Sequence, residues 1–424
     1  MHKPYRPTAP ATTPRALHTR WIAGASVALL ATLAQAESSP YYIGASLSYA
    51  HDSNLLRLRD ESAVTDRSDK VTTAALLAGI DQPIGRQRIF GNVALRSNRF
   101  ADNDQYDNQS YTAVAGLDWS TVERLSGNLT ASANRALSSF NLQGQDGPVE
   151  KNLETARTLD AAVRLGLVTE YSFELTGGYR QIDNSLARVQ TRDYRQNTVA
   201  AGVHWRPSPD SDFGLALRDT RGRYPRYGEV GSPREVDRFK RQDVDLSASI
   251  KPSGASTLSL RLSNGKTEYD LDTGRDFSGF TGSLGWLWQV SGKLRLNTRL
   301  ARETGQDSYV VTDFFGNPGT TDYSRINNSL RVKADYELSA KIALNLAVTS
   351  TQRDIVLTQS GSPGDTPSEG RERNTAVSLG ARWTPVRSVM LGCDLGNERQ
   401  RHSGQQGVNL KATTTSCFAQ FTLQ

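Results

Sequence analysis

The chain has 424 residues and a formal net charge of +6, with 37% hydrophobic and 22% charged residues. Lys3, Arg6, Arg15 and Arg20 lie near the N-terminus, so the rest of the chain carries +2 (6 − 4), which excludes the strongly basic footprint of a nucleic-acid-binding protein. After Leu33 no apolar run is long enough to cross a bilayer as a helix, so a helical inner-membrane protein is also excluded.

The first 36 residues have the features of a secretory signal peptide. Basic residues precede the apolar run Trp21–Leu33, and Ala34-Gln35-Ala36 follows it as a small-x-small cleavage site. The run is too short to span a bilayer as a helix. We therefore expect a signal peptide over 1–36, a mature chain over 37–424 and a destination in the bacterial cell envelope.

From Tyr41 onward, apolar and polar residues alternate in stretches of about ten residues, as in strands with one apolar and one wet face. In one stretch, Leu294 and Leu300 share one face, while Arg295 and Arg299 share the other. We predict strands near 41–51, 68–80, 87–100, 108–119, 124–140, 153–168, 171–184, 191–206, 211–223, 236–251, 255–269, 275–290, 293–306, 322–338, 341–357, 371–384, 387–401 and 406–424.

The links between these stretches alternate in length. Short links such as 122–123, 252–254 and 291–292 take turns with long polar links such as 52–67 and 358–370. A membrane barrel has short periplasmic turns and longer external loops, whereas a soluble β-sandwich, the alternative fold with the same residue alternation, has no reason to separate them. The sequence therefore predicts an all-β fold, a transmembrane antiparallel β-barrel of about 18 strands in the bacterial outer membrane.

Proline and aromatic residues are expected to follow the same division. Proline cannot donate a backbone N–H to a strand ladder, so most prolines are predicted to lie in links: Pro83, Pro207, Pro209, Pro225, Pro233, Pro252, Pro318, Pro363, Pro367 and Pro385. Aromatic residues on apolar faces, several of them close to short links, predict a girdle at a bilayer interface: Trp119, Phe173, Trp205, Trp286, Trp288, Tyr336 and Trp383.

If leucine faces lipid, the opposite face of each strand lines the lumen. Basic residues predominate in the lining that we infer, which predicts a preference for anionic or heavily hydroxylated solutes. The alternative is that mixed charges pair with one another across strands. The candidate lumen residues are Arg164, Arg180, Arg218, Arg261, Arg295, Arg299, Arg331, Lys333, Asp335 and Arg382.

Cys393 and Cys417 lie in the last two expected strands. If the hairpin between them is centred on Gln405, the two cysteines stand directly opposite each other, as do Leu391 and Ala419. In the oxidising cell envelope this arrangement predicts a disulfide, and the alternative is a pair of small apolar side chains facing lipid.

The sequence does not point to an enzyme or to a bound cofactor or metal. The predicted mature chain holds three histidines, His51, His204 and His402, and no Cys/His cluster has the spacing of a metal site. It also lacks a G-x-S-x-G nucleophile motif and a glycine-rich phosphate loop.

Two segments carry a resemblance to a known family. Tyr49-Ala-His-Asp-Ser-Asn-Leu-Leu-Arg-Leu58 resembles the Y-x-D-x-N-L-F-R-L signature of the EpsL family, and Cys417–Gln424 is similar to the last strand of that family. These are outer-membrane β-barrel proteins encoded with exopolysaccharide biosynthesis genes. The resemblance implies a channel that exports a secreted polysaccharide, or assembles it at the surface, among outer-membrane lipids and with periplasmic export components as partners.

The residues that match the signature are Asp52, Asn54, Arg57 and Leu58. They would contact or gate the polysaccharide, or they would have a structural role, since Asp and Asn satisfy backbone amides and Arg57 can pair with loop carboxylates. Two other functions stay open beside polysaccharide export. One is a general or solute-specific diffusion porin, and the other is a structural barrel with a blocked lumen.

Overall fold

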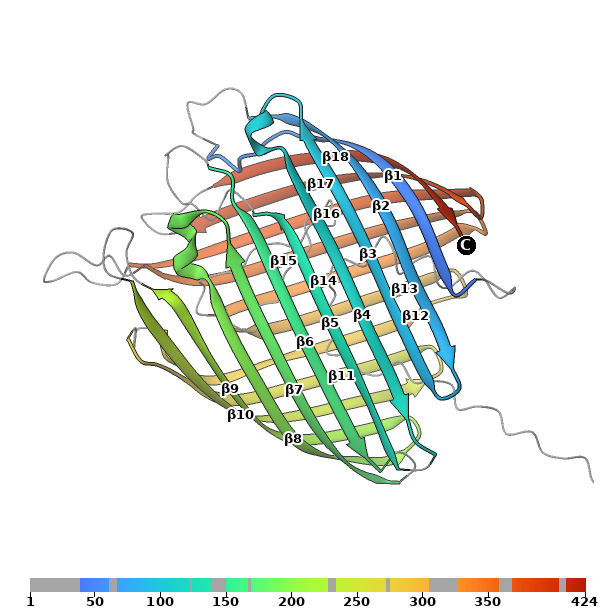
Figure 1. Ribbon diagram of the computed structural model, residues 1–424, viewed down its shortest axis with the longest axis vertical. Helices are drawn as coiled ribbons and strands as arrows, with labels where there is room; N and C mark the ends of the chain where they lie inside the picture. The colour runs from blue at the N-terminus through green and yellow to red at the C-terminus, as the bar shows by residue number, and fades with distance from the viewer. Residues whose placement is uncertain are drawn as a thin grey trace, which may run out of the picture.

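The computed structural model describes residues 39–60, 67–122, 124–138, 150–166, 169–227, 234–271, 275–304, 326–357, 368–403 and 409–424. Figure 1 shows long strands that wrap into a barrel. The expected signal peptide over 1–36 lies outside the described residues, so its cleavage stays a prediction.

The strands form an 18-stranded antiparallel sheet that closes on itself, which confirms the predicted fold class. Each strand pairs with its neighbours in the chain, and β1 pairs with β18, with Ile43 opposite Leu423. The strands are β1 (Tyr41–Asp52), β2 (Asp69–Ile84), β3 (Gln87–Phe100), β4 (Asn108–Ser120), β5 (Leu125–Leu137), β6 (Leu153–Leu165), β7 (Tyr171–Asn184), β8 (Tyr194–Ser208), β9 (Ser211–Tyr227), β10 (Glu235–Ser253), β11 (Ser256–Tyr269), β12 (Phe277–Gln289), β13 (Leu294–Glu303), β14 (Ile326–Ser339), β15 (Ile342–Leu357), β16 (Ser368–Val386), β17 (Val389–Ser403) and β18 (Leu410–Leu423).

The two faces of the sheet differ in side chains and in exposure. Large apolar side chains are exposed on the outer face, among them Leu47, Leu76, Leu217 and Leu379. The alternate residues face the interior of the barrel and are more buried than the outward residues, and many of them are polar. An outer surface of exposed leucine and valine is stable in lipid, and closure leaves no backbone edge unpaired there. The protein is therefore an outer-membrane β-barrel.

The two ends of the barrel differ in their connections. Gly85 and Arg86 alone join β2 to β3, and Gly85 takes a φ of 63°, which suits glycine in a tight turn. Two short 3₁₀ helices, η2 (Asp104–Tyr106) and η4 (Ala187–Arg192), lie in links at the other end. No helix among the described residues is long and apolar enough to cross a bilayer. We place the end with short turns in the periplasm.

The predicted position is right for Pro209, in the turn between β8 and β9, and wrong for five other prolines. Pro233, Pro318, Pro363 and Pro367 lie outside the described residues. Pro83, Pro207, Pro225, Pro252 and Pro385 lie inside strands near their ends, not in links. Pro207, Pro225, Pro252 and Pro385 each fall where the strand register shifts. A β-bulge leaves a residue unpaired, so proline can occupy that position without breaking a ladder hydrogen bond.

Aromatic side chains are exposed on the outer face near the short turns, as expected of a girdle. Phe173, Trp205, Tyr336 and Trp383 each expose more than a third of their surface. The Trp286 and Trp288 rings stack with centroids 5.1 Å apart. The remaining girdle candidate, Trp119, is partly exposed in β4.

Candidate channel lumen

The lumen wall is the strand face opposite the exposed leucines. Strand pairing carries this face from one strand to the next, so that Arg218 opposes Asp243, and Arg261 opposes Ser247. The structure places the predicted lining residues on this inner face: Arg164, Arg180, Arg218, Arg261, Arg295, Arg299, Arg331, Lys333, Asp335 and Arg382. Most of them do not stand as isolated charges.

A continuous ion-pair network crosses β9, β10 and β11. Arg218 contacts Asp245 at 2.9 Å and Asp243 at 3.1 Å, and Arg261 contacts Asp245 at 3.6 Å. Arg241 contacts Asp243 at 2.9 Å and also donates to Thr304 and Thr281. Three guanidinium groups and two carboxylates leave this part of the wall near +1 (3 − 2), and their mutual contacts hold them in place.

A second network lies closer to the short turns. Arg164 on β6 pairs with Glu174 on β7. His204 lies 3.8 Å from Glu174 and 2.7 Å from Asp212, which Arg206 also contacts at 2.8 Å. The charges of Arg164 and Arg206 are thereby balanced by the two acids.

Two further arginines of the lining have neighbours that hold them. Arg382 donates to Asn345 at 2.9 Å, lies 3.7 Å from Asp394 and stands 5.9 Å from the Phe418 ring centroid. Arg180 is 9% exposed, and its guanidinium carbon lies 5.7 Å from the Tyr194 ring centroid. Neither guanidinium is therefore a freely moving charge in the lumen.

The wall formed by β13 and β14 is different. Arg299 stands directly opposite Arg331, and Asn297 stands opposite Lys333. Arg299 pairs with Glu303 at 3.1 Å and Lys333 pairs with Asp335 at 3.0 Å, whereas Arg295 reaches only the neutral side chain of Gln289 at 3.1 Å.

Arg331 makes no side-chain hydrogen bond or ion pair with any described residue, and its neighbour in register on β15 is the uncharged Thr349. Four cations (Arg295, Arg299, Arg331 and Lys333) and three acids (Glu303, Asp335 and Glu337, the last exposed near the short turn) leave this wall near +1 (4 − 3). Directly opposed like charges destabilise a strand pair. An anion between Arg299 and Arg331 would offset that repulsion.

The sequence analysis overestimated the basic excess of the whole lumen. The structure places further acids on the inner face: Asp212, Asp243, Glu303, Glu372, Asp394 and Glu398. Glu372 forms an ion pair with Arg353 at 2.8 Å, as other acids of the wall do with nearby cations. The inward arginines Arg295 and Arg331, which pair with no acid among the described residues, both lie on the β13–β14 wall.

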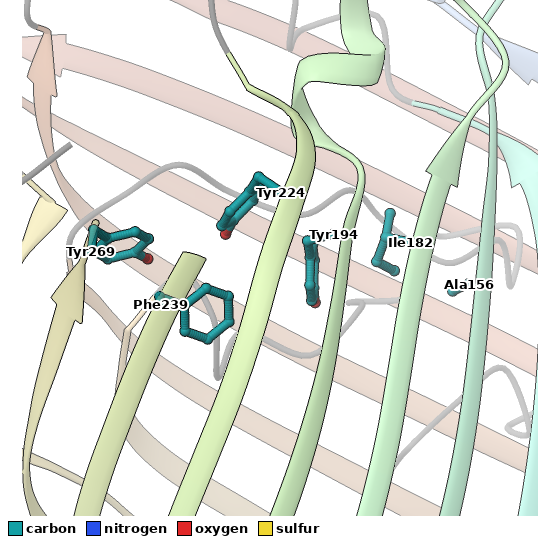
Figure 2. Close-up of a cluster of buried hydrophobic side chains, with 6 residues drawn as sticks. All are labelled: Ala156, Ile182, Tyr194, Tyr224, Phe239 and Tyr269. Carbon is teal, nitrogen blue, oxygen red and sulfur yellow. The ribbon is translucent and has the colours of Figure 1, made fainter. Parts of the chain in front are cut away.

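A cluster of aromatic side chains, which the sequence analysis missed, lines the interior near the ends of β8 to β11. Figure 2 shows Tyr194, Tyr224, Phe239 and Tyr269 on adjacent strands, with the Phe239 and Tyr269 centroids 5.5 Å apart. The guanidinium carbon of Arg275 lies 4.2 Å from the Tyr269 ring centroid and 4.3 Å from that of Tyr224. In the sequence, this cluster could have been recognised from the aromatic residues at inward positions of neighbouring strands.

Beside this cluster, Asp193 follows η4 and is buried. Burial raises the pKa of its carboxyl group, although the backbone N–H and the side-chain amide of Asn184 both donate to it. Arg226 lies 3.5 Å away. These contacts hold the start of β8 against the end of β7.

The residues of the expected family signature form a compact turn at the end of β1. Asp52 accepts from the backbone N–H of Asn54 at 2.8 Å and pairs with Arg57 at 2.8 Å. The Asn54 side chain accepts from the Leu58 N–H at 2.9 Å and donates to the carbonyl oxygens of Leu58 at 2.9 Å and Lys411 at 3.1 Å. Arg57 also pairs with Glu398 at 3.1 Å. These contacts tie the link after β1 to β17 and β18.

The cysteines face outward. Cys393 stands opposite Cys417 in the β17–β18 register, with Leu391 opposite Ala419, and the structure joins the two cysteines by a disulfide. The described residues contain no group of three or more His, Cys, Asp or Glu side chains placed to hold a metal ion.

No family model matches the chain, and no curated protein matches it. Among solved structures it is similar to the outer membrane protein OpdK from Pseudomonas aeruginosa, with 13% identity over 90% of this chain and 99% of that chain, and a TM-score of 0.45. OccK2 (OpdF) of the same organism, in complex with glucuronate, shares 13% identity over 91% and 98%, with a TM-score of 0.47. The ferric citrate transporter FecA in the unliganded form shares 11% identity over 87% of this chain and 61% of that chain, with a TM-score of 0.43.

These findings correct the resemblance to the EpsL family. No family model matches, and the similar solved structures are Opd and Occ proteins and a transporter, not members of that family. The signature residues have a local explanation, because Asp52, Asn54, Arg57 and Leu58 hold one turn together. The family assignment and the export of a polysaccharide that it implied are therefore dropped.

Proposed function

We propose that the protein is a diffusion channel for small water-soluble solutes and that the β13–β14 wall makes it prefer anions. A barrel of eighteen strands is wide enough to enclose an aqueous path. The polar, charged inner face described above suits water and polar solutes, while the outer face suits lipid.

The observation that carries the anion preference is the pair of Arg299 and Arg331. Directly opposed side chains of an antiparallel pair have Cβ atoms about 5 Å apart, so the two guanidinium groups share one small region of the wall. Guanidinium groups bind carboxylate and phosphate in a planar, bidentate manner. A dissolved carboxylate or phosphate would therefore be stabilised here relative to a cation.

The test is the reversal potential of the purified barrel in a planar bilayer under a salt gradient. We expect the wild-type channel to favour chloride over potassium, and Arg299→Ser/Arg331→Ser to lower that permeability ratio several-fold. Arg331→Lys keeps the charge and should keep the preference. The matched control is Arg382→Ser/Asp394→Ser, which removes one positive and one negative lumen charge together and should leave the ratio unchanged.

Two results would contradict the proposal. If the bilayer shows no conductance with folded, inserted protein, the barrel is not an open channel. If conductance is present but the double serine variant has the wild-type reversal potential, the β13–β14 wall does not select ions.

A further inference from the structure

The outer face of β8, β9 and β10 carries a row of cations. Arg195 stands directly opposite Arg223, and Arg223 stands directly opposite Arg238, so three arginines lie side by side across three strands. In the next outward row Arg221 stands opposite Lys240. All five side chains are exposed. We call these five residues the outer arginine patch.

Few acids balance this patch. Asp219 accepts from Arg221 at 2.8 Å. On β11 Glu268 stands opposite Lys240 and pairs with Lys266 at 2.5 Å, and just after β11 the exposed Asp270 donates its backbone N–H to the carbonyl oxygen of Arg238 at 2.9 Å. Glu235 lies beyond the register shift at the start of β10, opposite Tyr227. The side chains of Arg195, Arg223, Arg238 and Lys240 make no hydrogen bond or ion pair with any described residue.

Such a row is unfavourable for the protein alone. Directly opposed like charges destabilise an antiparallel pair, and here one strand, β9, has like charges opposite on both sides. Three adjacent strands span about 10 Å, which is the scale of one phosphorylated headgroup. An anion with more than one phosphate would relieve the repulsion among all three arginines.

The position of the patch indicates where that anion comes from. Toward the short turns, the outer face of the same strands becomes apolar, with Val199, Leu217 and Leu246 more than half exposed. Toward the other end lie the long links 185–193 and 228–234. The patch therefore lies at the external boundary of the apolar band, at the depth of lipid headgroups. Figure 1 shows β8, β9 and β10 side by side on one wall of the barrel.

We propose that the outer arginine patch binds the phosphate groups of a lipid in the external leaflet of the membrane. The acyl chains of this lipid would lie on Val199, in the next outward row below the patch, and on Leu217 and Val244, one row further and beyond Asp219 and Gln242. The apolar surface beneath the arginines favours a lipid-borne phosphate over a free phosphate ion, since only a lipid contacts both. The site is on the outside of the barrel and is independent of the proposed channel function.

The test uses the full-length mature barrel in detergent and measures bound lipid by native mass spectrometry. The probes are diphosphorylated lipid A, lipid A without its phosphates, phosphatidylcholine and inorganic phosphate as a competitor. We expect diphosphorylated lipid A to bind and the two other lipids to bind far more weakly. Arg195→Gln/Arg223→Gln/Arg238→Gln should weaken lipid A binding by about a hundredfold, because each surface arginine contributes about a factor of five to the attraction of an anionic lipid.

Two further variants make the result interpretable. Arg195→Lys/Arg223→Lys/Arg238→Lys keeps the charge and should bind lipid A more tightly than the glutamine variant. Asp354→Asn/Arg371→Gln removes a neutral ion pair from the outer face of β15 and β16, away from the patch, and should bind like the wild type. Circular dichroism checks that each variant is folded.

The proposal is overturned if the folded glutamine variant binds lipid A as the wild type does. It is equally overturned if the control pair on β15 and β16 weakens binding as much as the patch variant. Displacement of lipid A by equimolar inorganic phosphate would show a free-phosphate site instead and would also reject the lipid.

Discussion

At the scale of residues, side chains of the same type have different roles in different surroundings. Asp52, Asn54 and Arg57 look like a functional signature in sequence, yet in the structure their polar atoms are used within one turn. Arg57 takes a φ of 53°, an uncommon conformation for a residue other than glycine, and its contacts to Asp52 and Glu398 hold it there. Short polar side chains next to a strand end commonly form hydrogen bonds with nearby backbone groups, which gives them a structural role.

The contacts of Asn54 predict a measurable structural role. The side chain is 3% exposed, and replacing it by alanine leaves the Leu58 N–H and the Lys411 carbonyl oxygen without this partner. We expect Asn54→Ala to lower the free energy of unfolding by about 1–3 kcal/mol and to speed proteolysis of the link after β1. Urea titration of the barrel in lipid vesicles measures the first effect.

The matched control is Asn397→Ala, because Asn397 faces outward and donates one exposed hydrogen bond to Thr413. Its cost should stay below about 0.5 kcal/mol. Equal costs for the two alanine variants would contradict the structural role of Asn54.

At the scale of elements, alternation in the sequence was sufficient to predict the strands and which face of each is apolar. Leu294 and Leu300 face outward and Arg295 and Arg299 inward, as the period of two requires. Alternation was not sufficient to predict which inward charges form ion pairs. Whether Arg218 contacts Asp243 depends on the register between the two strands. It also failed for Pro207 and Pro252, because a bulge is a property of two paired strands and not of one.

The β17–β18 hairpin gives a prediction at this scale. Cys393 and Cys417 are opposed on the outer face, so protein purified without reductant should show no free thiol under denaturing conditions. Cys393→Ser/Cys417→Ser should still fold, because the strand ladder and barrel closure do not depend on the bond. Its unfolding free energy should fall by on the order of 3 kcal/mol or less.

Thiol titration of denatured protein, with and without prior reduction, measures the oxidation state directly. Two reactive thiols before reduction would contradict the disulfide. The double serine variant serves as the blank.

At the scale of the whole molecule, closure and the asymmetry of the two ends decide how the barrel sits in the membrane. The alternation of link lengths allowed both to be predicted from the sequence, since a closed barrel must return its chain to the same side after every second strand. The charge balance of the lumen and the outer arginine patch could not be predicted in this way. Arg195, Arg223 and Arg238 are far apart in sequence and meet only because β8, β9 and β10 pair in one register.

The orientation of the barrel predicts the accessibility of its links on intact cells. Gly254 lies in the short turn between β10 and β11, with no heavy atom within 4 Å of a Cβ added there. Gly361 belongs to the link 358–367, outside the described residues, and that link joins the ends of β15 and β16 that lie at the opposite end of the barrel. Because short turns face the periplasm, antibody should label intact cells that carry an epitope tag at Gly361 and not those with the tag at Gly254.

Both tags should be labelled once the outer membrane is permeabilised, which controls for expression. Labelling of Gly254 alone would reverse the orientation and place the outer arginine patch in the periplasmic leaflet. Labelling of both sites on intact cells would contradict a membrane-spanning barrel, since one of the two ends must be shielded by the bilayer.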